Sequence, residues 1–326
     1  MSSDALSDVL RAVRLEGAVF YEVHARAPWA AAAPPAHEMA PHVLPGAEHV
    51  MEYHLVVAGT CWGNVDGGTP VLLEAGDVVA FPQGEAHVLA SQPTPLAKDA
   101  PANRTRRPVG GQLPVAIVGG GSGDAVHLMC GFIGWDARPF NPLLATLPRM
   151  IHVRGGGGGL LEHLMRAAVT ETAERRPGGE TVLARLSELF FVEIVRRHIA
   201  TLPPEQTGWL AGLRDDFVGR ALALLHDRPA DDWSLDALAS AVGLSRSALA
   251  ERFMHLVGVP PIQYLTRWRM QLAASLLAGG TASVAEAAVV VGYGSEAAFS
   301  RAFKKLVGVP PAAWRDSRRR GPGSAQ

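Results

Sequence analysis

The chain has 326 residues, of which 48% are apolar and 19% charged, and its formal net charge is −1. This composition is typical of a packed globular protein of about two domains and excludes a disordered chain. No apolar run approaches the ~18 residues of a membrane span, and the N-terminus lacks the basic start and apolar stretch of an export signal. We therefore expect a cytoplasmic protein without membrane contact. Two cysteines, Cys61 and Cys130, are too few for a disulfide framework.

The charge is unevenly distributed along the chain. Residues 1–213 carry 16 basic and 21 acidic side chains, or −5, whereas residues 214–326 carry 14 and 10, or +4. A basic C-terminal third favours an anionic partner, although a solvated basic surface would have the same composition.

The first 155 residues are expected to form a β-domain. They contain the β-rich runs "EYHLVVAGTCWGNV", "TPVLLEAGDVVAFPQG" and "AVHLMCGFIGW", bounded by Gly and Pro. Residues 156–208 contain two amphipathic helical stretches separated by "RRPGG", which predicts a helical hairpin followed by a linker. The apolar faces of this hairpin are predicted to pack on the sheet domain, on a second subunit, or on both. We expect a homodimer, with Leu186 and Phe190 as candidate contacts with the partner subunit.

Residues 209–320 contain a repeat. "SLDALASAVGLSRSALAERFMHLVGVPP" at 234–261 aligns with "SVAEAAVVVGYGSEAAFSRAFKKLVGVPP" at 283–311. Each copy reads as a helix, a glycine-containing turn and a second helix, which is a helix-turn-helix. Ser245 and Ser295 are suited to cap the second helices, and Gly258 and Gly308 to end them. The segment "IQYLTRWRMQLAASLLAGG" between the copies reads as one long helix, with Arg267 and Arg269 exposed near its start.

The second helix of each copy has an exposed face suited to a DNA groove. Small and polar side chains there would reach base edges, and cations beside them would contact phosphates. If the two second helices lie ~34 Å apart, their exposed faces would enter successive major grooves on one side of a double-stranded DNA operator. The predicted DNA-binding residues are Arg246, Ser247, Ala250, Glu251, Arg252, Arg267, Arg269, Glu296, Ala297, Ser300, Arg301, Lys304 and Lys305.

Residues 214–316 resemble the DNA-binding domain of the AraC/XylS family of bacterial transcription regulators. The resemblance is carried by "VGYGSEAAFSRAFKKLVGVPPAAWR" at 291–315, which includes Gly292, Ser295, Phe299 and Trp314. It implies an operator, a small-molecule effector and RNA polymerase as partners, and it leaves open whether the protein activates or represses. Glu251 departs from the family, because many members have a cation or amide at this position. An acid there would accept from cytosine or reject wrong sites.

The N-terminal region resembles the cupin-like sensing domain of one branch of that family. "GDVVAFPQGEAH" at 76–87 matches the second cupin motif, and "EYHLVVAG" at 52–59 lies where the first motif ends. The implied fold class is α+β: a cupin-like β-barrel of jelly-roll type, a helical hairpin, and an all-α domain with two helix-turn-helix units.

The resemblance implies an effector pocket in the barrel, without a metal or another cofactor. Catalytic cupins hold a metal with a His-x-His pair, a Glu and a later His, and the His-x-His pair is absent here. The predicted pocket residues are Glu52, His54, Trp62, Phe81 and His87. Two alternatives stay open: a metal-dependent cupin enzyme fused to a DNA-binding domain, and a thiol redox regulator that uses Cys61 and Cys130. No catalytic residue is predicted.

Overall fold

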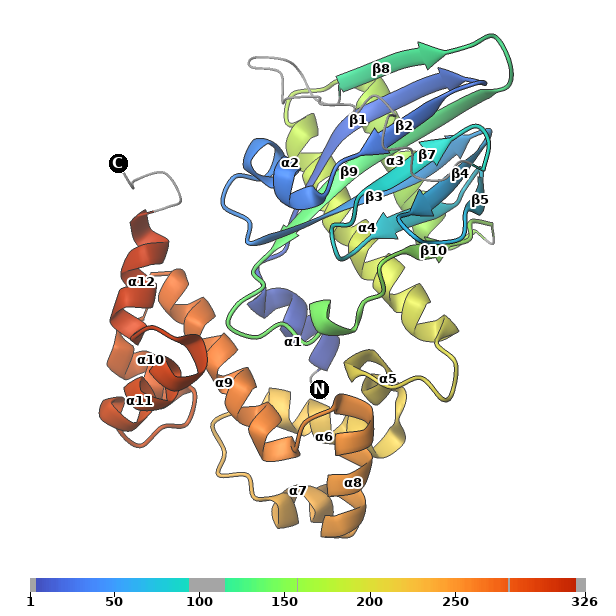
Figure 1. Cartoon of the computed structure of the whole chain (residues 1–326). Coiled ribbons are helices and arrows are strands. Elements are labelled where there is room, and N and C mark those ends of the chain that lie inside the picture. The colour runs from blue at the N-terminus through green and yellow to red at the C-terminus, as the bar shows by residue number, and fades with distance from the viewer. Residues whose placement is uncertain (1–3, 94–114, 157, 281, 321–326) are drawn as a thin grey trace. The chain divides into compact units, whose positions relative to one another are not determined.

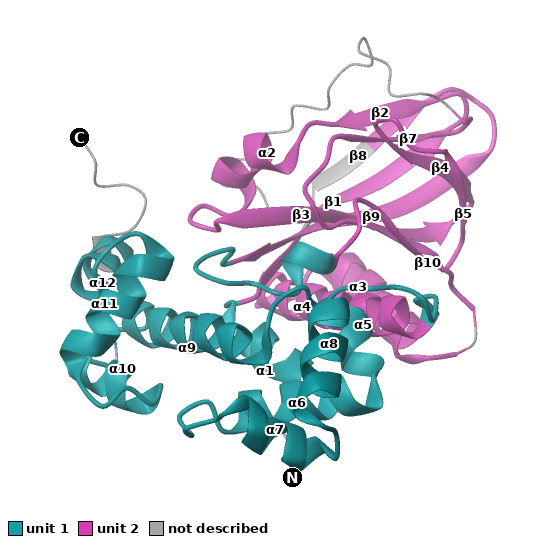
Figure 2. Cartoon of the chain, turned by 60° about the horizontal axis from the view of Figure 1, so that its bottom comes forward, with its two compact units in different colours: residues 1–14, 136–146, 201–326 teal, residues 15–135, 147–200 magenta. Residues whose placement is uncertain are grey.

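The computed structural model describes residues 4–93, 115–156, 158–280 and 282–320 (Figure 1). The chain forms two compact units that interleave along the sequence (Figure 2). The helical unit contains residues 1–14, 136–146 and 201–326, and the sheet unit contains residues 15–135 and 147–200. The limits predicted from the sequence made each domain one continuous stretch, whereas the chain passes between these two units four times.

The sheet unit contains two β-sheets, in agreement with the predicted β-rich cupin-like fold. Their strand orders are β10-β6-β3-β9-β1-β8 and β2-β7-β4-β5. The pairs are antiparallel except for β1 and β8, which are parallel. The strands are β1 Glu16–Arg26, β2 Ala30–Ala33, β3 His49–Ala58, β4 Thr60–Val65, β5 Val71–Glu74, β6 Val78–Phe81, β7 His87–Ala90, β8 Val115–Gly120, β9 Ala125–Trp135 and β10 Ile151–Val153.

Strand alternation decides which side chains lie between the two sheets. On β3, Glu52, His54 and Val56 share one face because successive side chains point to opposite sides. Val56 belongs to an apolar cluster that also includes Leu73 and Leu89 of the other sheet. The core of this unit is therefore built from the inward faces of both sheets.

The helical hairpin packs on the outer face of the six-stranded sheet, which is one of the alternatives that the sequence left open. It consists of α3 (Leu160–Glu174) and α4 (Gly179–Thr201). The Tyr53 hydroxyl donates to Ser187 Oγ of α4 at 2.6 Å. A Cβ at Gly17 of β1 would lie 2.5 Å from the carbonyl oxygen of Ala184, so a residue without a side chain permits this close approach.

Part of the apolar face of the hairpin packs on its own sheet. Phe190 is fully buried, with its ring centroid 6.0 Å from that of Tyr53, so the suggestion that Phe190 faces a partner subunit is wrong. Leu186 is half-buried, and Val182 and Leu189 remain 44% and 47% exposed.

The helical unit is built around the two predicted helix-turn-helix copies. Copy one has α7 and α8, copy two has α10 and α11, and α9 joins them (Figure 1). The helices of this unit are α1 Ala5–Ala12, α5 Trp209–Arg214, α6 Asp216–Asp227, α7 Leu235–Val242, α8 Arg246–Val257, α9 Pro261–Ala278, α10 Val284–Val290, α11 Glu296–Val307 and α12 Pro311–Arg320. A short 3-10 helix, Leu144–Thr146, also belongs to it, whereas α2 (Ala36–Val43) lies in the sheet unit.

Two short segments from the first half of the chain pack with these helices. The side chain of Gln271, which is 1% exposed, donates to the carbonyl oxygen of Ala12 at 3.1 Å and accepts from the amide of Phe140 at 3.0 Å. The ring of Phe140 also meets Tyr264 edge-on, with centroids 5.5 Å apart. Residues 4–14 and 136–146 therefore contribute to the core of the helical unit.

In the part of the chain that the structure describes, no helix is both long enough and apolar enough to cross a membrane.

Candidate functional site

The second helix of copy one has the predicted start, core and end. The hydroxyl of Ser245 accepts from the amide of Ala248 at 3.2 Å, which caps the first turn of α8. Gly258 ends the helix with φ +79°, a conformation that glycine adopts without strain. Leu249 and Phe253 are fully buried, which fixes the opposite face of α8 toward solvent.

Copy two repeats this construction residue by residue. Ser295 accepts from the amide of Ala298 at 3.2 Å, and Gly308 ends α11 with φ +90°. Phe299 and Phe303 are fully buried and in contact, with ring centroids 5.5 Å apart. The two copies therefore present equivalent helix faces.

Most predicted DNA-binding residues lie on these faces. Ala250 and Ser300 are half-buried at the edges. The exposed residues are Arg246, Ser247, Glu251 and Arg252 on α8 and Glu296, Ala297, Arg301, Lys304 and Lys305 on α11. Their role in binding DNA stays a prediction.

The two faces differ in the availability of their cations. Arg246 lies 3.4 Å from the carboxylate of Asp236 in an exposed pair. Among the described residues, Arg301, Lys304 and Lys305 form no ion pair or hydrogen bond through their side chains. The exposed face of α11 therefore offers three cations to an anionic partner.

Three other predicted DNA-binding arginines have partners inside the helical unit. Arg252 donates to the carboxylate of Asp215 at 2.8 Å. Arg269 donates to the carbonyl oxygens of Pro229 at 2.6 Å and Asp231 at 2.7 Å. Arg267 lies over the ring of Phe140, 6.0 Å from its centroid.

The prediction that Arg267 and Arg269 are exposed is wrong, since both are half-buried. Their contacts hold α9 against neighbouring segments of the same unit, and this role needs no DNA.

The sheet unit contains a cavity of about 70 Å³ between its sheets. Since a buried water needs ~10–15 Å³, this volume holds several waters or a small organic group. Three of the predicted pocket residues, Glu52, His54 and His87, line it. The other lining residues are Tyr21, Val23, Trp29, Ala31, Ala32, Ala33, Pro34, Met39, Leu89, Leu128 and Cys130.

The polar end of the cavity is a chain of hydrogen bonds through His87, His54 and Cys130. For neutral imidazoles, the partners determine which nitrogen of each ring carries the proton. His87 Nδ1 lies 3.0 Å from the carbonyl oxygen of Glu85, so it must donate, and His87 Nε2 is then an acceptor. His54 Nε2, 2.8 Å away, donates to it. His54 Nδ1 therefore accepts from the Cys130 thiol at 2.8 Å.

Glu52 completes this end of the cavity, 3.8 Å from His54 Nε2 and 3.7 Å from His87 Nε2. Burial raises the pKa of Glu52 to about 8. Burial also lowers the pKa of His87 to about 4, and burial together with the neighbouring His87 lowers the pKa of His54. Near neutral pH the three groups are therefore uncharged and suited to a neutral polar group of a ligand.

Two predicted pocket residues do not line the cavity. Trp62 pairs with Leu72, which is 41% exposed, whereas the neighbouring Cys61 is 1% exposed and inward. Trp62 therefore points away from the cavity, and its assignment to the pocket was wrong. Phe81 is fully buried behind the polar end, with its ring stacked on His87 at 3.7 Å.

The apolar wall of the cavity was not predicted from the sequence. Tyr21 and Val23 alternate along β1, and this pattern could have assigned them to the inner face. Trp29 and the "AAAA" strand 30–33 carry no such signal, because a run of alanines has no inner and outer face.

Glu52, His54 and His87 also form a donor set that could hold a metal ion, since one ligand atom of each lies within 4.8 Å of the others. Two imidazoles and a carboxylate suit a late first-row divalent ion. His54 would first have to move its Nε2 proton to Nδ1, which faces the Cys130 sulfur. The donors therefore fit a metal chemically, although the first cupin motif lacks its His pair.

Both thiols are unlike those of redox sensors. Cys61 and Cys130 are buried, and burial raises the pKa of Cys61 to about 12 and that of Cys130 well above its ordinary value. A reactive cysteine needs an accessible thiolate, so this geometry disfavours the thiol hypothesis.

Two family models match this chain. One, described as a cupin, matches residues 4–200, and one described as a helix-turn-helix domain matches residues 238–317.

Several curated proteins match over most of its length. A protein of Streptomyces lividans described as an AraC-like transcription regulator is 37% identical over 82% of this chain and 88% of its own length. A Streptomyces antibioticus protein with the same description is 33% identical over 96% and 98%. The HTH-type transcriptional regulator AlkR of Acinetobacter baylyi is 28% identical over 93% and 95%.

Proposed function

Because this chain belongs to the AraC-like transcription regulators with a cupin-type N-terminal domain, we propose that α8 and α11 bind one DNA operator and that the cavity binds its small-molecule effector. The observation that carries the DNA half is the pair of equivalent capped helices, each with its polar face outward. The protein acts in the cytoplasm, where its operator is, and RNA polymerase is the partner through which it changes transcription.

The two recognition helices are spaced by a single stiff element. With 18 residues, α9 is ~27 Å long, which is comparable to the ~34 Å between successive major grooves. Arg301, Lys304 and Lys305 contact phosphates, and the small and polar residues at the start of α11 contact base edges. On α8, Glu251 accepts from the amino group of cytosine.

Lys305→Ala tests this interface. Loss of one phosphate contact should weaken binding to all DNA sequences alike and reduce the log–log salt slope of the affinity by ~0.9. Fluorescence anisotropy with an operator found by genome-wide mapping of bound DNA measures both. Arg166→Ala, an exposed arginine of the sheet unit, is the matched control and should change neither. Unchanged slopes for single substitutions at Arg301, Lys304 and Lys305 would remove α11 from the interface.

The effector is a small molecule with a mostly apolar body and one neutral polar group. Tyr21, Trp29 and Leu128 contribute to an apolar wall around that body. The uncharged end formed by Glu52, His54 and His87 orients the polar group. Binding changes the relative populations of states with different operator affinity.

The protein forms a homodimer through the hairpin. On α4, Val182, Leu186 and Leu189 are spaced as one stripe, of which Val182 and Leu189 are large apolar residues with partly exposed side chains. A second copy would cover this stripe. Leu189→Glu should then yield a folded monomer in analytical ultracentrifugation, whereas an unchanged dimer would place the contact elsewhere.

A second candidate function is a metal-dependent cavity, because Glu52, His54 and His87 together could hold a metal ion. Metal analysis of the purified protein tests it. A response that is lost on chelation and restored by one metal would replace the metal-free cavity with a metal-containing one. We assign no catalytic residue, and the relatives are themselves transcription regulators.

A further inference from the structure

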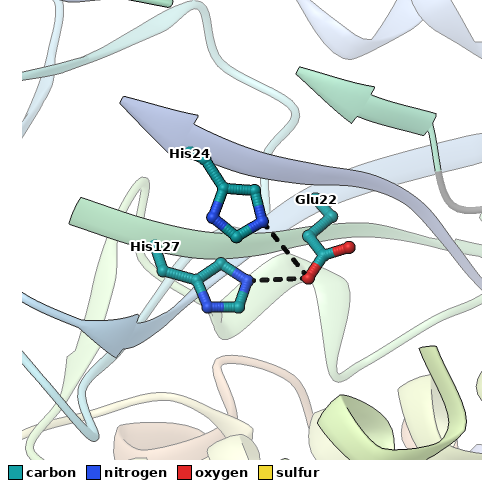
Figure 3. Close-up of side chains that lie close together, drawn as sticks. All are labelled: Glu22, His24 and His127. Atoms are coloured by element: carbon teal, nitrogen blue, oxygen red, sulfur yellow. Dashed lines mark hydrogen bonds and ion pairs between the residues drawn. The ribbon is translucent and has the colours of Figure 1, made fainter. Parts of the chain in front are cut away.

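A second group of possible metal ligands lies on the outer face of the six-stranded sheet, away from the cavity. Glu22 and His24 are on β1, and His127 is on β9 (Figure 3). The β1–β9 register places His24 directly opposite His127, and Glu22 lies two residues before His24 on the same face. Tyr21 and Leu128, their neighbours in sequence, line the cavity on the inner face.

The three side chains converge on one point. Glu22 Oε1 lies 2.9 Å from His127 Nε2 and 3.5 Å from His24 Nε2, as the dashed lines in Figure 3 show. The imidazole rings are stacked with centroids 4.1 Å apart and 19° between their planes. Two ligands bound at 2.0–2.1 Å to a tetrahedral ion are ~3.3 Å apart, so the His24 distance already fits and the His127 distance needs to open by a few tenths of an ångström.

We propose that Glu22, His24 and His127 bind one late first-row divalent ion, with zinc as the best match. Two imidazole nitrogens and one carboxylate oxygen are the donors of a three-ligand zinc site whose fourth position is open. His24 is 47% exposed and His127 20%, so an ion enters from solvent and water takes the fourth position.

The ion would join two strands that both contribute to the wall of the cavity. Since it binds the folded pair of strands and not the unfolded chain, it stabilises the sheet unit by an amount that grows with zinc concentration. An ordinary surface hydrogen bond between His127 and Glu22 would give no such dependence.

The test uses the full chain, freed of metal with a chelator and titrated with zinc chloride by isothermal titration calorimetry. Wild type should bind zinc at this site, and His24→Ala and His127→Ala should each weaken that binding at least about tenfold, which is ~1.4 kcal/mol. Glu22→Gln, which keeps the shape of the side chain, should also weaken it. His42→Ala, an exposed histidine on α2, is the matched control and should bind as wild type does.

Two further variants separate this site from the cavity. His87→Ala should retain the outer-face zinc, because His87 lies between the sheets. Thermal unfolding with and without zinc should show a stabilisation in wild type, His42→Ala and His87→Ala that is absent from His24→Ala and His127→Ala. Failure of wild type to bind zinc, or zinc binding lost in His87→Ala but unchanged in His24→Ala and His127→Ala, would overturn the proposal.

Discussion

Glu52 is a carboxyl group enclosed between two imidazoles and apolar walls, and its ionisation opposes folding. Its pKa rises from 4.5 to about 8 in the folded protein. Between these values the folded protein holds one more proton than the unfolded chain, so the free energy of unfolding falls as pH rises. The lowered pKa values of His54 and His87 act in the opposite direction, but only below the ordinary imidazole pKa of 6.5.

Glu52→Gln should therefore change how stability depends on pH. From pH 6.5 to 8, wild type should lose up to about 2 kcal/mol of unfolding free energy that the variant retains, because glutamine cannot ionise. Urea unfolding at both pH values measures the difference. Parallel losses in the two proteins would show that the Glu52 carboxyl is ionised in the folded state across this range.

At the level of elements, the turns of the two helix-turn-helix copies form a natural comparison. Gly243 and Gly292 occupy equivalent positions with φ +78° and +79°. A Cβ at Gly243 would meet nothing within 4 Å, whereas a Cβ at Gly292 would lie 2.4 Å from the carbonyl oxygen of Ala230. Both glycines therefore have a left-handed φ angle, and only copy two adds a steric clash.

Gly243→Ala should cost ~1 kcal/mol of unfolding free energy, the strain of a side chain in the left-handed region. Gly292→Ala should cost clearly more, because Ala230 or the turn must move. Thermal unfolding of both variants gives the comparison, and operator affinity should fall more for Gly292→Ala. Equal costs would mean that the contact with Ala230 contributes nothing to stability.

The helices were predictable from the sequence, and the details of the sheets were not. Spacing of four at Leu249 and Phe253, with a serine before and a glycine after, identifies α8 from local chemistry alone. The alternation of side chains correctly predicted that Glu52 and His54 of β3 point inward. On β4 it did not, because Cys61 and not Trp62 points inward. A period of two leaves that choice open, and pairing with β5 and β7 decides it.

The partners of Arg269 were hidden for a similar reason. The carbonyl oxygens that it binds lie about forty residues earlier in the chain, and carbonyl groups leave no trace in a sequence. A basic side chain on a predicted helix therefore looks available for DNA in the sequence, even when backbone carbonyl groups of the folded protein bind it.

For the whole molecule, the proposed effector cavity and the proposed DNA-binding helices lie in separate compact units. His87→Ala should abolish the transcriptional response to an inducer identified by reporter screening, while operator affinity without inducer stays within about twofold of wild type. Trp62→Ala, which changes the outward face of β4, is the control and should respond normally. A normal response by His87→Ala would move the sensing site out of this cavity.

The four passages of the chain between the units limit how this protein can be taken apart or recombined. A fragment beginning at residue 201 would lack residues 1–14 and 136–146 and would leave both partners of the Gln271 amide behind. A buried amide without partners costs ~1–3 kcal/mol. A chimaera with the sheet unit of another regulator would therefore have to retain residues 1–14 and 136–146 of this chain, because they belong to its helical unit. Exchanging one unit for that of another protein would therefore require several junctions in the chain, because neither unit is one continuous segment.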